Sequence, residues 1–422
     1  MNLTEHYQKT RDFLERYRPF WYDEILNRYP QTLEVYPKSW IETLDKLSAH
    51  ELWELDSKTS YSFLKDTPIF PFIEEIRTLS SFLQVLKIDS STLLGGMREK
   101  KAHEISYLAP YIGALQKEHE FSHIVDIGGG LGHLSRALSK NLDIPCICLD
   151  HDKSLQKKGQ SLLTNENVEF ISKGLGNPII PSVDFDVLSE EESNRVFSPD
   201  SLTVGLHSCG ALSLRLMDEV INHRSKALIN FPCCYSKLNP ISEVNLSSLS
   251  LKNPLPLSKI GLTLASRSHS KFSFEDFLLK ELIKKIRYTF HLLLFEKLNI
   301  TDFTGAGNYP LKKYQEGFST YAKEKLKELS LENNFSKKEL DDFFEEKKDL
   351  VRYMFLCNIL RWQTGRVLEI HLLIDRALYL QENGFEVELF ELFKQEISPR
   401  NIGIFALKKE GEVTFPSSNG LS

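Results

Sequence analysis

The sequence predicts an α/β protein in which a parallel β-sheet is accompanied by two mostly helical regions. Two observations support this prediction. In the middle of the chain, short apolar runs alternate with segments of helical periodicity, and the first run ends in a cluster of glycines. Before and after this stretch, apolar residues recur every three or four positions, which is typical of helices. At about 150 residues per domain, a chain of 422 residues has room for two or three such units.

The first segment, residues 1–115, is expected to be a helical N-terminal region. Apolar side chains follow one another at helical spacing, as at Trp40 and Leu44, and prolines interrupt the pattern at intervals. The segment leads into a helix expected over 101–119. Pro110 is expected to kink this helix, because proline cannot donate a backbone hydrogen bond.

The second segment, residues 116–240, is expected to hold the α/β core. Apolar runs of strand length predict five strands, at 123–127, 144–149, 168–172, 202–206 and 227–231. Helical patterns follow the first two runs, over 131–141 and 153–163. Strands that are joined through helices normally run parallel, so the core is expected to be a parallel sheet built from β-α-β units.

The rest of the chain is expected to interrupt and then complete this core. Residues 241–365 have mostly helical patterns, and the part from 271 to 350 carries 15 basic and 15 acidic residues. Residues 366–410 predict a final helix and two terminal strands, at 385–390 and 402–407. The expected architecture is therefore an α/β sheet with a helical N-terminal region and a helical insertion before the last helix and strands.

Composition excludes several classes of protein. Hydrophobic residues make up 41% of the chain, enough to bury real cores, so extensive disorder is excluded. The 52 basic and 58 acidic residues give a net charge of −6, which argues against coating nucleic acid through bulk charge. The six cysteines have no disulfide-framework spacing and fit a reducing compartment. Because the sequence has no signal-peptide core and no apolar run of about 18 residues, a soluble cytoplasmic protein without a membrane partner is expected.

The most informative motif follows the first predicted strand. Asp126 lies in this strand, glycines occupy the alternate positions Gly128, Gly130 and Gly132, and a helix is expected to begin near His133. Glycine permits both a tight turn and a close approach of the backbone to a ligand. A dinucleotide fingerprint would require glycine in place of His133, and a P-loop would require Lys followed by Ser or Thr. Neither is present, which disfavours an NAD-dependent oxidoreductase.

The spacing Asp-x-Gly-x-Gly-x-Gly resembles the loop with which class I methyltransferases bind S-adenosylmethionine (SAM). This resemblance implies that Asp126 faces the amino group of SAM and that the glycine backbone and His133 lie along its methionine and ribose parts. Asp150 ends the second predicted strand, where an acidic side chain can accept hydrogen bonds from both ribose hydroxyls. The alternative is a structural glycine turn followed by an unrelated aspartate.

Further motifs narrow the resemblance. They are Lys-Lys-x-His-Glu at 100–104, Gly-Leu-His-Ser-Cys-Gly at 205–210, Pro-Cys-Cys-Tyr at 232–235 and Ser-Pro-Arg-Asn at 398–401. Together with the glycine loop they resemble the methyltransferase-like protein twenty-five family, also labelled ribosomal RNA adenine dimethylase domain-containing. The likeness spans residues 95–240 and 366–408, and it implies a class I, Rossmann-like methyltransferase with SAM as cofactor. Arg98-Glu99 and Phe231-Pro232 depart from the Ser-Pro and Val-Gly that are usual in the family.

The acceptor of the methyl group is less narrowly indicated. His-x-Cys-Gly with Pro-Cys-Cys also occurs in a transfer-RNA 2′-O-methyltransferase family, and RNA is slightly favoured. A protein or a small molecule is the alternative, and so is a non-catalytic module of the same fold that binds a partner through its helical regions. The complete set of Asp126, Gly128, Gly130, Gly132 and Asp150 argues against the non-catalytic module.

Candidate catalytic residues follow the fourth and fifth predicted strands, whose carboxyl ends are expected to flank the methyl group. His207 is a candidate general base, because the ordinary pKa of histidine, about 6.5, is near working pH. The alternative is a histidine that hydrogen-bonds the loop beside the cofactor. Tyr235 is expected to line the acceptor pocket. Cys233 is similar to the nucleophilic cysteine of pyrimidine C5 methyltransferases, although simple packing beside the cofactor is the plainer interpretation.

Two other groups of residues have open interpretations. A contact with the carboxylate of SAM, or a place in a lid, is expected for Lys100, Lys101, His103 and Glu104, and a solvated helix face is the alternative. His207, Cys209, Cys233 and Cys234 raise the question of zinc. Adjacent cysteines point in different directions unless the loop bends, so no metal site is predicted.

Overall fold

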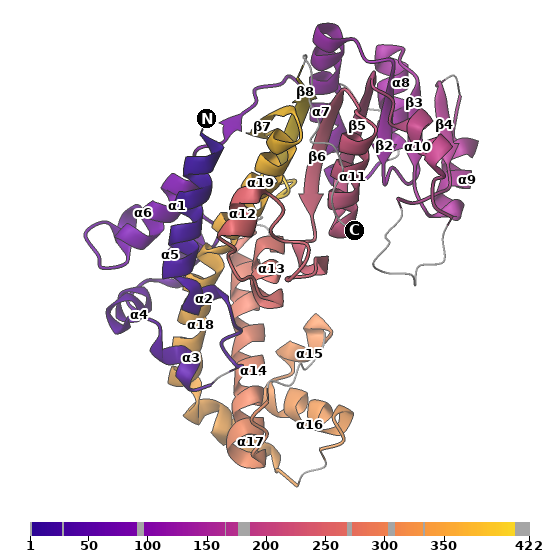
Figure 1. The fold of residues 1–422 in the computed structure, drawn as a ribbon. Helices are drawn as coiled ribbons and strands as arrows, with labels where there is room; N and C mark the ends of the chain where they lie inside the picture. Colours follow the sequence, from indigo (N-terminus) through magenta and orange to yellow (C-terminus); the bar gives the residue numbers. More distant parts are fainter. Residues whose placement is uncertain are drawn as a thin grey trace, which may run out of the picture. The chain divides into compact units, whose positions relative to one another are not determined.

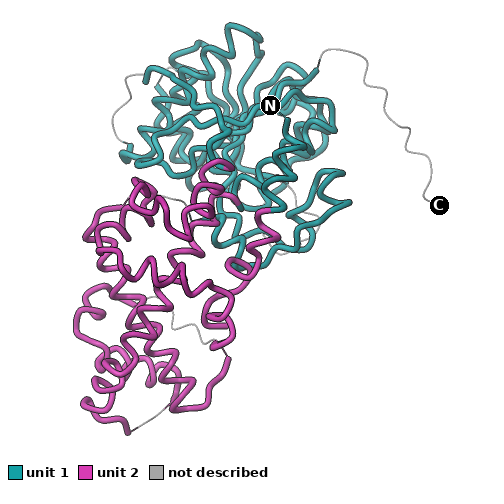
Figure 2. The backbone as a smooth tube through the Cα atoms, turned by 90° about the vertical axis from the view of Figure 1, so that its left-hand side faces the viewer, with its two compact units in different colours: residues 1–12, 80–268, 368–422 teal, residues 13–79, 269–367 magenta. Residues whose placement is uncertain are grey.

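The computed structural model describes residues 2–27, 29–90, 97–164, 166–175, 186–267, 272–302, 309–331 and 334–409. The chain divides into two compact units (Figure 2). The first consists of residues 1–12, 80–268 and 368–422, and the second of residues 13–79 and 269–367. Each unit therefore collects segments that are distant in the sequence.

The first unit is built on an eight-stranded sheet (Figure 1). Its strands are β1 (Gln84–Val85), β2 (His123–Ile127), β3 (Cys146–Leu149), β4 (Val168–Ile171), β5 (Ser201–Cys209), β6 (Ala227–Cys233), β7 (Phe385–Glu391) and β8 (Ile402–Lys408). They lie in the order β1-β7-β8-β6-β5-β2-β3-β4. Strands β2 to β6 pair in parallel, whereas β8 is antiparallel to both of its neighbours, β6 and β7. The predicted α/β fold with a parallel core sheet is confirmed.

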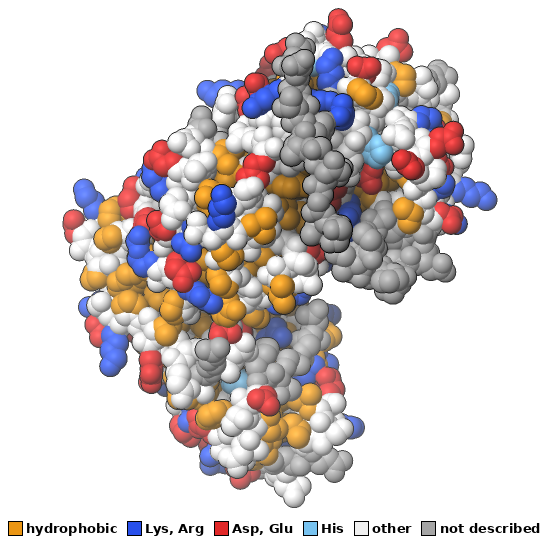
Figure 3. Space-filling view, viewed as in Figure 1, with side chains coloured by type: hydrophobic (Ala, Val, Ile, Leu, Met, Phe, Trp, Pro, Cys, Tyr) orange, Lys and Arg blue, Asp and Glu red, His pale blue; other side chains and the backbone are white. Residues whose placement is uncertain are grey.

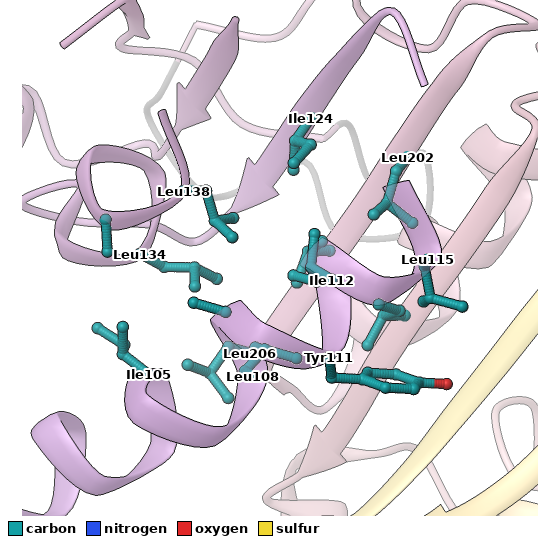
Figure 4. Packing of buried hydrophobic residues seen from close by; sticks show 14 of the residues in the cluster. Ile105, Leu108, Tyr111, Ile112, Leu115, Ile124, Leu134, Leu138, Leu202 and Leu206 are labelled. Carbon is teal, nitrogen blue, oxygen red and sulfur yellow. The ribbon is translucent and has the colours of Figure 1, made fainter. Parts of the chain in front are cut away.

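Helices connect these strands and cover both faces of the sheet. They are α7 (Glu99–His119), α8 (His133–Leu142), α9 (Lys153–Ser161), α10 (Glu190–Val196), α11 (Ala211–Asn222), α12 (Ser248–Lys252), α13 (Lys259–Ser266) and α19 (Gly365–Glu382). Pro110 lies inside α7, which continues through it. On one face, Ile112 of α7 and Leu134 of α8 join Ile124 and Leu202 of the sheet in a buried cluster (Figure 4). This cluster packs α7 and α8 against the central strands.

On the opposite face, α11 packs closely on β5. A Cβ atom at Gly205 would lie 2.5 Å from the side chain of Leu216. A larger residue at this position of β5 would therefore require the Leu216 side chain to move.

Strands β5 and β6 extend further than the apolar runs predicted. Their pairing continues with Ser208 opposite Pro232 and Cys209 opposite Cys233, after a register shift between Leu206 and Ser208. His207 lies at this irregularity, with a φ of 65°. The prediction for β5 ended too early because His207 and Ser208 interrupt its apolar run, and the prediction for β6 ended before Pro232, which usually marks the end of a strand. The two-residue strand β1 was not predicted either.

The remaining helices lie mostly in the second unit, although the earliest of them begins in the first unit. They are α1 (Leu3–Arg16), α2 (Arg18–Trp21), α3 (Gln31–Glu34), α4 (Lys38–Asp45), α5 (Ala49–Asp56), α6 (Phe70–Ser80), α14 (Phe274–Leu298), α15 (Leu311–Gln315), α16 (Phe318–Glu328), α17 (Lys337–Glu346) and α18 (Lys348–Gln363). In the second unit, α14 and α18 pack together, and the ring centroids of Phe277 and Phe355 are 5.9 Å apart. The helical character predicted for these regions is confirmed. Within the described ranges, no helix is both long and apolar enough to cross a membrane.

Candidate functional site

The strand order indicates a ligand site at the carboxyl ends of β2 and β5. From β2 the chain proceeds outward through β3 to β4, whereas β5 and β6 lie on the other side of β2. The order therefore reverses between β2 and β5, and open α/β sheets bind ligands outside the strand ends at such a point. The glycine turn follows β2, and His207 lies near the end of β5. Both motifs therefore belong to this place.

The backbone of the turn explains why its glycines alternate. The φ angles are 70° at Gly128, 57° at Gly130 and 66° at Gly132, all in the left-handed region that favours glycine. Gly132 is also crowded, since a Cβ atom there would lie 2.6 Å from the ring of Phe170. At Gly130 a Cβ atom would meet nothing nearer than the side chain of Leu155, 3.7 Å away. Gly130 is therefore the more open of these two positions on the protein side.

Two polar side chains hold the backbone of Gly130. Asp150, the residue after β3, accepts a hydrogen bond from the Gly130 amide at 3.0 Å, and Gln156 of α9 donates to the Gly130 carbonyl at 2.8 Å. The other carboxylate oxygen of Asp150 accepts from the Asp152 amide at 2.9 Å. The Asp150 side chain is still 11% exposed. Because each carboxylate oxygen can accept more than one hydrogen bond, Asp150 can hold the turn and also bind a ligand.

Asp126 lies beneath the turn. It is 2% exposed, and its Oδ2 accepts a hydrogen bond from the hydroxyl of Ser135 on α8 at 2.7 Å. A Cβ atom at residue Gly129 would lie 2.8 Å from the same oxygen. Burial raises the pKa of Asp126, although the Ser135 hydrogen bond and the charge of Lys101 oppose this rise. Asp126 therefore braces the turn against α8, and its contact with the amino group of SAM stays a prediction.

Lys101 and His133 lie close to the turn. The charge of Lys101 is near enough to Asp126 and His133 to influence the pKa of both. Burial, Lys101 and Arg136 together lower the pKa of His133, whose Nδ1 is 3.0 Å from a guanidinium nitrogen of Arg136. His133 is thus a neutral ring beside two cations, and the structure brings both predicted residues to the cofactor turn.

His103 is engaged elsewhere. Its Nε2 accepts a hydrogen bond from the Lys394 amide at 3.1 Å, and its ring lies 4.8 Å from that of Tyr107, measured between centroids. Burial and the charge of Lys394 lower the pKa of His103, in keeping with a neutral acceptor. A cofactor contact for His103 stays a prediction.

Three motifs that are distant in the sequence meet at one carboxylate. Glu104 of α7 is 1% exposed, and its Oε1 lies 2.8 Å from Nε2 of His207. The same oxygen accepts a hydrogen bond from the hydroxyl of Ser398. The ammonium of Lys100 is 3.5 Å away. The Lys-Lys-x-His-Glu, Gly-Leu-His-Ser-Cys-Gly and Ser-Pro-Arg-Asn motifs therefore share one hydrogen-bonded cluster.

The charge state of Glu104 determines what His207 can do. Burial alone would raise the pKa of Glu104, but hydrogen bonds from His207 and Ser398 and the charge of Lys100 bring it below its ordinary value. An ionised carboxylate only accepts hydrogen bonds, so Nε2 carries the proton when the His207 ring is neutral. The lone pair then belongs to Nδ1. The His207 side chain is 28% exposed, and the carboxylate of Glu104 sets its orientation. Its role as a general base stays a prediction.

Replacing Glu104 with glutamine is expected to destabilise the protein near neutral pH by about 1–3 kcal/mol, because His207 and Ser398 lose a charged acceptor. The folded-state pKa of Glu104 lies below its ordinary value. Its contribution is therefore complete above the ordinary pKa of about 4.3 and is lost as the pH falls through the folded-state pKa. Urea unfolding of both proteins near neutrality and in acid measures this difference. Glu118→Gln, at an exposed position of the same helix, is the control.

A difference between Glu104→Gln and the wild-type protein that stays the same in acid would contradict this account. It would show that the ionised form of Glu104 does not stabilise the folded state.

The cysteines of the two motifs lie together at the ends of β5 and β6. The sulfur of Cys209 is 3.2 Å from that of Cys233 and 3.3 Å from that of Cys234. The loop bends at Cys234, which has a left-handed backbone with a φ of 54°. This bend is the condition under which the adjacent cysteines were expected to converge. Hydrogen bonds with the other two thiols lower the pKa of Cys209, whereas contact with Cys209 and burial raise the pKa of Cys233. Cys209 is therefore the thiol that ionises first.

Tyr235 follows this bend and is buried, with 1% exposed. Its hydroxyl donates to the Pro232 carbonyl at 3.5 Å, and burial raises its pKa well above the ordinary value. In the structure Tyr235 supports the loop after β6. A contact with the acceptor stays a prediction.

Sequence reasoning named Glu104 only as a possible cofactor or lid contact, and it did not place Ser398 or Gln156 among the site residues. A signal for Glu104 was present, because it lies beside Ile105 in an apolar stripe of the predicted helix, where a carboxylate has to be paired. Ser398 was marked only as part of the Ser-Pro-Arg-Asn motif, and Gln156 gave no signal. Their roles depend on which segments meet in space.

Residues 100–240 match the model of a protein family described as "Methyltransferase domain". The matched segment contains the glycine turn, Asp150, His207 and the cysteine-rich loop. The sheet, with its turn at the strand reversal, is a Rossmann-like fold of the class I methyltransferase type. The matched segment therefore resembles a methyltransferase domain, for which SAM is the expected methyl donor.

Two solved structures are similar at low identity. One is the plantazolicin methyltransferase BpumL in complex with SAH, with a TM-score of 0.21 and 13% identity over 45% of this chain and 62% of that chain. The other is coclaurine N-methyltransferase bound to N-methylheliamine and SAH, with a TM-score of 0.24 and 11% identity over 96% of this chain and 94% of that chain. This chain thus spans less than two thirds of the plantazolicin enzyme. At these TM-scores, neither likeness bears on the site or on the acceptor.

Proposed function

We propose that the protein transfers the methyl group of SAM to an acceptor that loses a proton in the reaction, and that His207 takes up this proton. The observation that carries the proposal is the 2.8 Å contact of His207 with the buried carboxylate of Glu104, at the strand end beside the glycine turn. A base held by a second group in this way is the usual arrangement for proton removal.

The contributions of the chain follow from this geometry. When bound, SAM supplies a methyl group on a positively charged sulfur, which leaves with the electron pair of the broken bond. The turn at Gly130 and the carboxylate of Asp150 would hold SAM, so that the acceptor atom can approach in line with the methyl–sulfur bond. The acceptor proton would pass to Nδ1 of His207. The negative charge of Glu104 would stabilise the imidazolium that forms.

For the acceptor we propose RNA, in the cytoplasm. The support is the resemblance of the motifs to the methyltransferase-like protein twenty-five family and to a transfer-RNA 2′-O-methyltransferase family. On the face drawn in Figure 3, basic and acidic side chains are interspersed. Recognition of RNA would therefore use local contacts near the site and not a large surface of uniformly positive charge. A protein or a small molecule is the alternative acceptor.

The test uses purified protein and SAM labelled in its methyl group. The labelled SAM is incubated with a cell extract separated into RNA, protein and small molecules, and the label in each fraction is counted. The proposal expects label in RNA that depends on the protein and is lost with Asp150→Ala. Label in protein or small molecules alone would overturn the RNA acceptor but leave methyl transfer standing. A protein that binds SAM yet labels no fraction would count against proton removal by His207 as a working catalytic step.

Replacing Asp150 with alanine is expected to weaken SAM binding by about 1.5–3 kcal/mol, the usual value of charged hydrogen bonds. The loss has two sources, because Asp150 is expected to bind the ribose and also holds the Gly130 amide. Calorimetric titration with SAM measures it. Asp152→Ser is the matched control, because serine can still cap α9 where Asp152 accepts from Ser154 and Leu155. Equal affinities of Asp150→Ala and wild type would show that the ribose lies elsewhere.

A further inference from the structure

Three thiols converge where β5 and β6 end. The sulfur atoms of Cys209, Cys233 and Cys234 all lie within 4.8 Å of one another. In the described part of the chain, no other group of His, Cys, Asp or Glu side chains comes together in this way with ligand atoms of a metal site. The convergence of three soft donor atoms therefore distinguishes Cys209, Cys233 and Cys234 from the other three cysteines.

The convergence is built into the backbone. Parallel pairing of β5 with β6 places Cys209 directly opposite Cys233. The amide of Gly210 donates to the Cys233 carbonyl at 3.0 Å and ties the two strand ends together. Cys234 then takes its left-handed conformation, which turns its side chain back toward Cys209. A residue other than glycine adopts such a conformation at a cost, and costs of this kind are concentrated at functional sites.

The surroundings suit a cation. Cys233 is 5% exposed, whereas Cys209 and Cys234 are only half-buried, so an ion can reach the sulfur atoms from solvent. A thiolate is the form that binds metal. Thiolates prefer zinc and other soft ions over magnesium or calcium.

We infer that Cys209, Cys233 and Cys234 bind one zinc ion through their three sulfur atoms. Each thiol that coordinates the ion loses its proton to solvent, and neither the sulfur nor the zinc changes oxidation state. With Zn–S bonds of about 2.3 Å in tetrahedral geometry, the sulfur atoms need to be about 3.8 Å apart. The observed separations of 3.2 and 3.3 Å open to this value through small side-chain rotations. The fourth position is left to water or another ligand, since no further protein group of the described residues joins the cluster.

This inference does not rest on the methyltransferase function. It is tested by measuring the metal content of the protein, and this measurement does not depend on an activity assay. The protein is purified under reducing conditions with zinc in the medium, desalted, and analysed for metals by inductively coupled plasma mass spectrometry. We expect one zinc per chain in the wild-type protein and in Cys357→Ser, a buried cysteine far from the cluster in sequence. We expect the triple variant with serine at 209, 233 and 234 to hold none.

Cobalt provides a second measurement that needs no variant. Cobalt(II) added to the metal-free wild-type protein is expected to give the strong thiolate-to-cobalt absorption of a cysteine-rich tetrahedral site, and zinc is expected to abolish it. Absence of this band together with absence of zinc would overturn the inference. So would zinc retained in the triple variant. Protection of two of the three thiols from alkylation, with no zinc bound, would instead identify a disulfide and would equally overturn it.

Discussion

Replacing His207 with alanine is expected to lower turnover at least a hundredfold while SAM affinity stays nearly unchanged. Removal of a positioned base typically costs about 10²–10⁴ in rate. His207 belongs to the hydrogen-bonded cluster with Glu104 and Ser398. It is not a hydrogen-bond partner of the Gly130 backbone. Binding and catalysis should therefore separate. Single-turnover methylation of the acceptor found with labelled SAM gives the rate, and calorimetry gives the affinity.

Two controls distinguish a base from a structural histidine. His207 has a φ of 65°, and asparagine tolerates this region better than most residues. His207→Asn can also keep a hydrogen bond to Glu104, so it is expected to preserve the loop and still lose turnover. Free imidazole is expected to restore part of the lost rate to His207→Ala. If His207→Asn methylates at the wild-type rate, the proton needs no protein base.

Replacing Gly130 with valine is expected to abolish SAM binding. The φ of 57° lies in the left-handed region, where a β-branched residue costs about 1–2 kcal/mol or more. The nearest protein atoms would be 3.7 Å from the new Cβ, so the variant is expected to fold. The larger effect comes from the side chain filling the space where the backbone meets its ligand. Calorimetric titration with SAM measures the loss.

Gly317→Val is the matched control for this variant. Gly317 also has a positive φ, 99°, and a Cβ atom there would meet nothing within 4 Å. Its replacement should therefore cost stability through the backbone alone and leave SAM binding unchanged. If Gly130→Val binds SAM with an affinity within threefold of the wild-type value, the assignment of the cofactor to this turn is wrong.

The elements that the sequence predicted well are those with local signals. The strand at 123–127 is marked by an apolar run, and the turn after it is marked by glycines, which favour a left-handed backbone. The structure has strand β2 and three positive φ angles there. The terminal strands are marked by apolar runs in the same way. What could not be predicted depends on pairing, as in the extension of β5 to Cys209 against Cys233.

The candidate site shows the same division. The turn and Asp150 follow from spacing along the chain, whereas the cluster of Glu104, His207 and Ser398 joins residues that are 103 and 294 positions apart. No periodicity reports such a contact. The bend at Cys234 could not be predicted either, because cysteine has no preference for the left-handed region.

The central claim is that this turn binds SAM in a class I methyltransferase fold. Calorimetric titration of the purified protein with SAM, and separately with NAD, tests it most directly. The account predicts that SAM binds at one site per chain, that Asp150→Ala weakens this binding while Asp152→Ser does not, and that NAD gives no heat of binding. A protein that binds NAD, or that binds neither compound, would contradict it.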